Sequence, residues 1–328
     1  MNKKYVIKFF SQFNDFFILV LLAAACVLYI SNCVAFMTPL AIICIVSLHA
    51  ALRLARSRRC TVTVNAGTPL QTVVIKKFRL LYICACLMIF ILGLWKNIPL
   101  LEIFIAVSAL LVMAQYSNLD FHKSSQLLIA CGVGGITLLL AGLLMGYGTI
   151  LSAVHVLFLY LLTDALPVTA LSSACSDDES HETFSLRHNF LCRGTLEGIM
   201  LGMLGLLAYA IGTVYVGSTA GRSMAFAIFG TSLFIHSFNL YDSRSLFLSG
   251  ALGGKMAIGF LSGVSIIIIV LSIAPGAFGL RQLTASQWLI VTGLCIVLVA
   301  VIEIEKIIQQ RSGNRIFMEK SGNPFYGK

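Results

Sequence analysis

Long apolar stretches separated by short polar loops dominate the chain. A helix needs about 20 consecutive apolar residues to cross the roughly 30 Å hydrocarbon core of a bilayer, and ten stretches come close to that length. They fall at residues 12–31, 35–53, 80–96, 98–115, 126–146, 149–172, 196–216, 223–241, 256–276 and 286–307. The pattern predicts an all-α, polytopic membrane protein with ten helices. The first stretch continues past Cys26, so we expect a retained helix and not a cleaved signal peptide.

The basic residues predict the orientation of these helices. Of the 23 Lys and Arg residues, only Lys96, Arg222 and Arg281 fall in loops on one side, and the others fall on the opposite side together with both termini. Short loops rich in Lys and Arg face the cytoplasm. We therefore expect a multi-pass protein of the cell membrane with both termini in the cytoplasm.

Composition narrows the function classes further. The 328 residues are 59% hydrophobic and 11% charged, with a mean hydropathy of +0.94, which excludes an ordinary soluble domain. Most of the ten cysteines lie inside apolar runs, so a secreted disulfide scaffold is not expected. The net charge is +10, and the basic residues flank apolar segments. We therefore expect them to face anionic lipid head groups and not nucleic acid.

Several motifs resemble P-type cation-transporting ATPases of the calcium and sodium-potassium pump class. The sequence LLTDALPVTAL at residues 161–171 is similar to the NLVTDGLPALAL segment of helix 6 in that family. Further matches occur in the family's order: QFND at 12–15, GTPLQ at 67–71, RSMAFAI at 222–228, QWLI at 287–290 and EIEK at 303–306. The resemblance implies the family's ten-helix transmembrane bundle, with helices 1–4 in residues 1–125 and helices 5–10 in residues 126–328 of one transmembrane domain.

The cytoplasmic domains of that family have no counterpart in the loops. The family's actuator domain would lie between helices 2 and 3, where only Arg53–Arg79 is present, and its phosphorylation domain between helices 4 and 5, where only Tyr116–Ser125 is present. The DKTGT, TGE and GDGxND motifs are absent from the sequence. Without the acyl-phosphate acceptor there is no nucleophile for phosphoryl transfer. We expect no catalytic residues, no cofactor and no ATP as a partner.

The helix 6 motif retains part of a cation site. Pro167 has no N–H, so the carbonyl of Thr163 loses its helical partner. Asp164 lies beside it within the apolar stretch, where a carboxylate costs about 2.5–3.5 kcal/mol and needs a partner. A freed carbonyl, a hydroxyl and a carboxylate are oxygen ligands for a small cation. Thr163 and Asp164 are therefore predicted as a weak residual site for a monovalent cation or a proton.

The other positions that the family uses have changed. On helix 5 its SSNIGE pattern becomes ACGVGG at 130–135, which replaces an amide and a carboxylate with glycines that let helices approach closely. Helix 4 loses its proline and carboxylate near residues 114–117, Tyr160 replaces an asparagine, and Leu233 and His236 replace two amides on helix 8. The favoured interpretation is a protonated Asp164 hydrogen-bonded to Tyr160, with no role in transport. The alternative is a proton or monovalent-cation site assisted by His155 or His236, either of which could equally be a packing residue.

Three functional hypotheses follow. The first is a non-catalytic accessory or regulatory protein whose retained helices associate with another membrane protein, such as an intact pump. The second is a passive or proton-coupled cation pathway centred on Asp164. The third is the membrane half of a split pump whose soluble domains belong to another chain, which the short loop between helices 4 and 5 disfavours.

Overall fold

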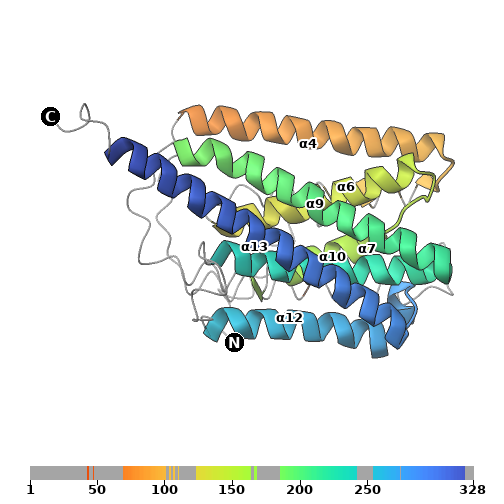
Figure 1. Ribbon diagram of the computed structural model, residues 1–328. Coiled ribbons are helices and arrows are strands. Elements are labelled where there is room, and N and C mark those ends of the chain that lie inside the picture. Colours follow the sequence, from red (N-terminus) through yellow and green to blue (C-terminus); the bar gives the residue numbers. More distant parts are fainter. Residues whose placement is uncertain are drawn as a thin grey trace, which may run out of the picture.

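The computed structural model describes residues 69–100, 103–104, 106–107, 110, 123–163, 166–167, 185–241, 254–273 and 275–321, together with residues 43 and 47. Every regular element in these ranges is helical. The elements are α4 Pro69–Trp95, α6 Lys123–Leu144, α7 Ala153–Thr163, α9 Ser185–Tyr215, α10 Ser218–Tyr241, α12 Gly254–Ile273, the short 3₁₀ helix η3 Pro275–Phe278, and α13 Ala285–Ser321. Most of the helices run roughly side by side (Figure 1).

Five of these helices are long and apolar enough to cross a membrane. Their spans are Gln126–Leu144, Arg193–Tyr215, Ser218–Leu240, Met256–Ile273 and Ala285–Ile304. Each coincides within a few residues with a stretch predicted from hydropathy. Leu80–Trp95 and Val154–Thr163 are shorter apolar helices at two further predicted positions. The stretch at 12–31, that at 35–53 apart from residues 43 and 47, and most of 98–115 lie outside the described residues. The described part of the chain is all-α, and the protein is a multi-pass membrane protein.

Helix ends differ more from the prediction than helix positions do. The predicted span at 196–216 belongs to a helix that begins at Ser185, and the span at 286–307 belongs to a helix that continues to Ser321. In contrast, α7 begins at Ala153 and not at 149, because residues 148–152 form the connection from α6 and Gly148 there has a φ of +76°. Hydropathy indicates the part of a helix that lies in the apolar layer of the membrane. The backbone hydrogen bonds of the helix can continue beyond that layer.

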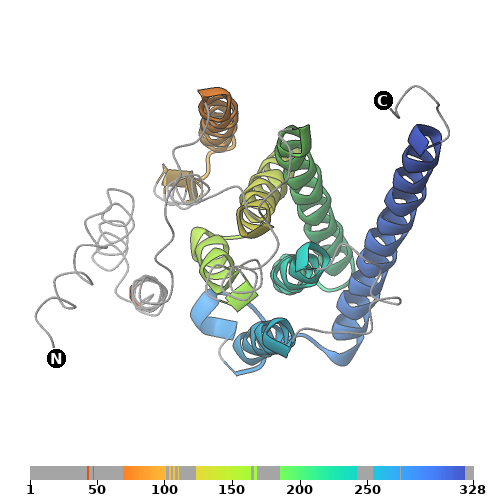
Figure 2. The same cartoon turned by 90° about the vertical axis from the view of Figure 1, so that its left-hand side faces the viewer.

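Helix α10 lies at the centre of the described bundle. It packs against α9, α12, α13, α6 and α7, and 89% of its most apolar segment is buried inside the protein. The corresponding values for α12 and α13 are 28% and 22%, and their outward faces carry exposed Ile258, Leu261, Leu289 and Ile296. Figure 2 shows α10 along its axis with the other helices around it. The helices on the outside thus present apolar surface to lipid.

A tight hairpin joins α9 to α10. Only Val216 and Gly217 separate the two helices, and Gly217 has a φ of +123°, which favours glycine. A Cβ on Gly212 would lie 2.6 Å from the Cα of Gly221, so the two backbones are in direct contact beyond the turn. We call this side of the bundle the hairpin end, and the side where α6 begins the Lys123 end. Because α9 and α10 are antiparallel, the start of α9 and the end of α10 both lie at the Lys123 end (Figure 1).

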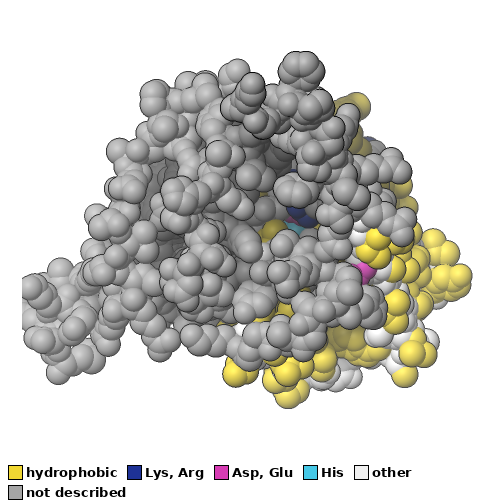
Figure 3. All heavy atoms as spheres, turned by 60° about the vertical axis from the view of Figure 1, so that its left-hand side comes forward, with side chains coloured by type: hydrophobic (Ala, Val, Ile, Leu, Met, Phe, Trp, Pro, Cys, Tyr) yellow, Lys and Arg dark blue, Asp and Glu magenta, His cyan; other side chains and the backbone are white. Residues whose placement is uncertain are grey.

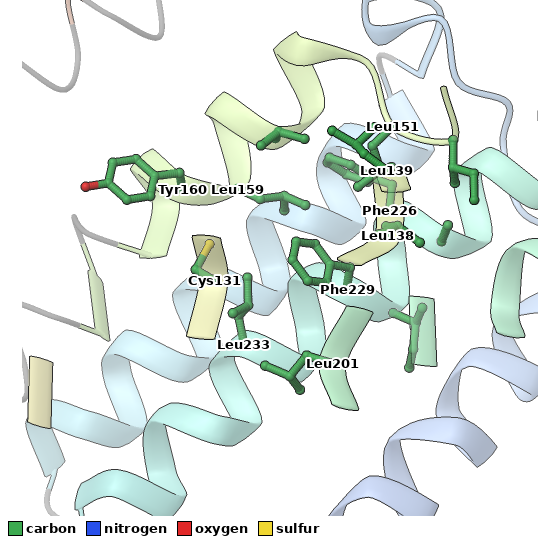
Figure 4. Packing of buried hydrophobic residues seen from close by; sticks show 14 of the residues in the cluster. Cys131, Leu138, Leu139, Leu151, Leu159, Tyr160, Leu201, Phe226, Phe229 and Leu233 are labelled. Carbon is green, nitrogen blue, oxygen red and sulfur yellow. The ribbon is translucent and has the colours of Figure 1, made fainter. Parts of the chain in front are cut away.

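Glycines bring α6 and α9 equally close. Gly198 and Gly202 lie one turn apart on α9, and a Cβ on each would lie 2.8 Å and 2.6 Å from backbone carbonyl oxygens of α6. Gly134 is one of those α6 residues, and the Phe229 ring of α10 packs against its other side. Figure 4 shows this core, with Phe229 among Leu138, Leu159, Leu201 and Leu233. The close approach predicted for the glycines of 130–135 is confirmed at Gly134.

Candidate functional site

The backbone at the predicted change in helix 6 is partly described. Helix α7 is α-helical over Ala153–Thr163, and Leu166 and Pro167, beyond two residues outside the described ranges, adopt π-helical geometry. The missing N–H of Pro167 accounts for this change in hydrogen bonding. The hydroxyl of Thr163 donates to the carbonyl of Leu159 at 2.7 Å and also makes a hydrogen bond with the Cys131 thiol of α6. Asp164 lies outside the described residues, so its interactions stay a prediction.

Other side chains fill the space beside the two glycines that replace cation ligands. A Cβ on Gly132 would lie 2.9 Å from the phenol oxygen of Tyr82, which belongs to α4. A Cβ on Gly135 would lie 3.5 Å from Leu110 and 3.7 Å from Val156. All three of these side chains are buried. The Tyr82 phenol therefore occupies room that a larger side chain at residue 132 would need, and a side chain at residue 135 would lie against two aliphatic side chains.

Tyr160 is fully buried, as expected for a residue on the inward face of α7. Its ring points away from Phe229 and Leu159 (Figure 4). The hydrogen bond predicted between Tyr160 and Asp164 falls partly outside the described residues and stays a prediction.

His155 has a partner for each ring nitrogen. The backbone N–H of Ser152 donates to Nδ1 at 3.1 Å, and Nε2 lies 2.6 Å from the carbonyl oxygen of Phe278 in η3. A neutral ring with its proton on Nε2 satisfies both contacts. The first contact also caps the start of α7, in the manner of a capping box. The rings of Phe226 and Phe278 pack against the imidazole. This geometry favours the packing interpretation of His155 over the relay.

A buried polar centre lies elsewhere, around Glu197 near the Lys123 end. Oε1 of Glu197 accepts a hydrogen bond from Nε of Arg193 at 3.0 Å, one turn earlier on α9. Oε2 accepts from the Gln126 amide of α6 at 2.6 Å. Nε2 of His236, on α10, lies 3.2 Å from the same oxygen, within ion-pair distance. We call these four residues the Glu197 centre.

Burial makes the Glu197 centre electrostatically significant. The side chains of Glu197 and His236 are 6% and 0% exposed, whereas that of Arg193 is 38% exposed. Charges in a medium of low dielectric constant interact more strongly than in water, and a buried carboxylate without such partners would be costly. The centre thus joins α6, α9 and α10 through one carboxylate.

Sequence reasoning identified His236 but missed Glu197, Gln126 and Arg193. Two signals could have found them. Glu197 is an ionisable residue inside the predicted span 196–216, and it follows Arg193 at the i,i+4 spacing of a helical ion pair. Residues 197 and 236 are also equally distant from the turn at 216–217, so an antiparallel hairpin brings them to the same level.

Comparisons with known proteins agree with the resemblance found in the sequence motifs. Residues 148–308 match the family described as cation transporting ATPase, C-terminus. Calcium-transporting ATPase 1 of Bacillus cereus is 30% identical over 218 residues, which cover 58% of this chain and 24% of that protein. A calcium-transporting ATPase of Listeria monocytogenes is 26% identical over 208 residues, which cover 58% of this chain and 23% of that protein. The chain thus spans about a quarter of the length of these relatives. The C-terminal half of the chain is therefore similar to the C-terminal membrane region of cation-transporting ATPases.

Proposed function

We propose that the chain is a non-catalytic, accessory or regulatory membrane protein built on the transport bundle of a cation ATPase. Its ten helices lie in the cell membrane with both termini in the cytoplasm, and its partner is another membrane protein such as an intact cation pump. The relatives transport calcium, but the proposed role does not require this chain to do so.

The observation that carries this proposal is the filled space on α6. Tyr82 packs against Gly132, and Leu110 and Val156 against Gly135, at the two positions where the family resemblance implies ligands. Calcium prefers six to eight oxygen ligands, usually with several carboxylates. The hydroxyl of Thr163, which the resemblance retains, already makes a hydrogen bond with the Cys131 thiol. The loops also lack the family's phosphorylation motif, which supports a role without ATP hydrolysis.

Ion flux in proteoliposomes tests the non-conducting part of the proposal. The purified chain should give no calcium, potassium or proton flux above that of protein-free vesicles, and Asp164→Asn should behave identically. An ionophore added at the end confirms that the vesicles were tight. A cation flux that Asp164→Asn abolishes would overturn the proposal in favour of a pathway centred on Asp164.

Two further measurements address the accessory role and the absence of catalysis. Co-reconstitution with an intact calcium pump from the same membrane should change the pump's ATP-driven uptake, whereas an unrelated multi-pass protein at the same density should not. Incubation of the isolated chain with labelled ATP should yield no acid-stable phosphoprotein. Unchanged pump activity would contradict the regulatory role, and a phosphoprotein would contradict the non-catalytic one.

A further inference from the structure

We propose that the hairpin end of the bundle binds the phosphate group of an anionic phospholipid between Arg222 of α10 and Arg281, which lies between η3 and α13. The acyl chains of this lipid lie against the apolar outer surface of α12 and α13. The site is separate from the helix 6 motif and from the Glu197 centre, and it does not depend on the accessory role proposed above.

The side chain of Arg222 points to a missing ligand. Its Nε is buried and has no hydrogen-bond partner. Among the described residues, the ion pairs are those of Glu197, and Arg222 takes part in none of them. A buried charged donor without an acceptor is costly, and nearly all such groups in folded proteins have a partner. An acceptor that the described polypeptide does not supply is therefore expected at this guanidinium.

The groups around Arg222 are aromatic or neutral. Phe226, one turn further along α10, packs against the rings of Phe278 and His155. His155 lies close enough to Arg222 for the charge of the arginine to act on it, and both of its ring nitrogens already have partners. None of these three neighbours is an anion, so they leave the charge of the guanidinium uncompensated.

A second arginine lies beside the first. The backbone N–H of Arg281 donates to Oγ of Ser223 at 2.8 Å, and Ser223 directly follows Arg222 in α10. This hydrogen bond holds the connection between η3 and α13 against the first turns of α10. The side chain of Arg281 is exposed. Because arginine side chains are long and their guanidinium groups bind phosphate oxygens through paired N–H groups, the two residues can share one phosphate.

The charge at the hairpin end favours an anion. In the described ranges, the Lys and Arg residues at this end are Lys96, Arg222 and Arg281. The acidic residues in the same ranges are Glu197, near the start of α9, and the three of α13, which come at Glu303 and beyond. All four lie toward the opposite end of the bundle, so this part of the chain provides the hairpin end with cations and no carboxylate.

The neighbouring surface favours a lipid over a free phosphate ion. The end of α12, η3 and the start of α13 lie together at the hairpin end (Figure 1). There, Ile273 of α12 is 78% exposed and Leu289 of α13 is 73% exposed. Most of the described side chains that are visible in Figure 3 are also hydrophobic. A phospholipid carries a phosphate next to acyl chains, so it matches the paired arginines and the apolar surface together.

Native mass spectrometry of the full chain, released from detergent micelles with defined added lipids, tests the proposal. Phosphatidylglycerol should bind about tenfold or more tightly than a diacylglycerol with the same acyl chains, because only the first accepts hydrogen bonds from guanidinium groups through a charged oxygen. Inorganic phosphate at the same concentration should not displace it. Equal binding of the two lipids would overturn the proposal. Displacement by inorganic phosphate would overturn the assignment to a lipid and indicate a site for the free ion.

Three variants locate the site. Arg222→Gln should weaken the binding of phosphatidylglycerol about tenfold or more, and Arg281→Gln about threefold, since solvent screens an exposed charge. Lys96→Gln is the matched control, because it removes a cation at the same end whose ammonium lies 5.9 Å from the Trp95 ring centre. This control should bind the lipid as the wild type does.

Circular dichroism shows whether each variant is folded. Equal binding by the wild type and a folded Arg222→Gln variant would overturn the proposal. If Arg222→Gln does not fold, equal binding by the wild type and Arg281→Gln, whose substituted side chain is exposed, would have the same consequence. A loss in Lys96→Gln as large as that in the arginine variants would also overturn it, because the lipid would then respond to the total charge of this end and not to a site.

Discussion

Alanine at Gly202 should push α6 and α9 apart, because the new Cβ would meet backbone and not a movable side chain. The Cβ would lie 2.6 Å from the carbonyl oxygen of Gly134 and 2.8 Å from the Cβ of Thr137. Ordinary contact requires a separation near 3.4 Å, so the helices must part by about 0.8 Å at this level. A change of rotamer cannot relieve the contact with a carbonyl oxygen.

The expected cost follows from two opposing effects. Overpacking a filled interior typically costs about 1–3 kcal/mol. Replacing a helical glycine with alanine returns about 0.5–1 kcal/mol, because the unfolded chain loses conformational freedom. Gly202→Ala should therefore lower the free energy of unfolding by about 1–2 kcal/mol. Gly293→Ala is the matched control, since it lies within α13 and a Cβ there meets nothing within 4 Å. That variant should be neutral or stabilised, which leaves a difference of about 2 kcal/mol between the two.

Unfolding of both variants in mixed micelles with increasing SDS, followed by circular dichroism, gives this difference. Equal stability of Gly202→Ala and Gly293→Ala would refute the reasoning, because it would mean that the α6–α9 interface has room for a methyl group. Greater loss of stability in Gly293→Ala would refute it as well.

Three other substitutions have equally specific outcomes. His155→Leu should lower the free energy of unfolding by about 2 kcal/mol in the same assay, because it leaves the part-buried N–H of Ser152 and carbonyl of Phe278 without their partner. Tyr82→Ala should lower the free energy of unfolding by about 3 kcal/mol or more. Gly132→Asn alone should prevent folding, whereas the double variant with Tyr82→Ala should fold, because the asparagine then has room. Ser223→Ala should cost about 1 kcal/mol, because its hydroxyl accepts a backbone N–H from the chain between η3 and α13, whereas Ser262→Ala, at an exposed hydroxyl bonded within its own helix, should change little.

Local chemistry made parts of this structure predictable. The span at 256–276 appears as Gly254–Ile273, because a strongly apolar stretch indicates the part of the chain that lies in the lipid. The π-helical geometry at Leu166 and Pro167 is consistent with the single missing N–H of Pro167. The extension of α13 to Ser321 was not predictable in this way, because its polar residues are helical outside the apolar region.

The candidate sites show where local reasoning ends. The loss of ligands at Gly132 was readable from the sequence, but the side chain that fills the space comes from α4, distant in the chain. Likewise the Glu197 centre requires the register of one hairpin and the packing of α6 against it. No pattern within a single segment specifies such contacts, since they depend on how separate helices meet.

The ion pair within α9 bears on how this segment first enters the bilayer. An isolated arginine or acidic residue deep in a membrane helix costs about 2.5–3.5 kcal/mol. Arg193 and Glu197 lie one turn apart on the same helix, so the pair can form as soon as α9 is helical, before α6 or α10 arrives. During synthesis α9 can therefore move from the translocon into the lipid as a helix whose two opposite charges already form an ion pair. When α6 and α10 pack against it later, their polar side chains join an ion pair that already exists.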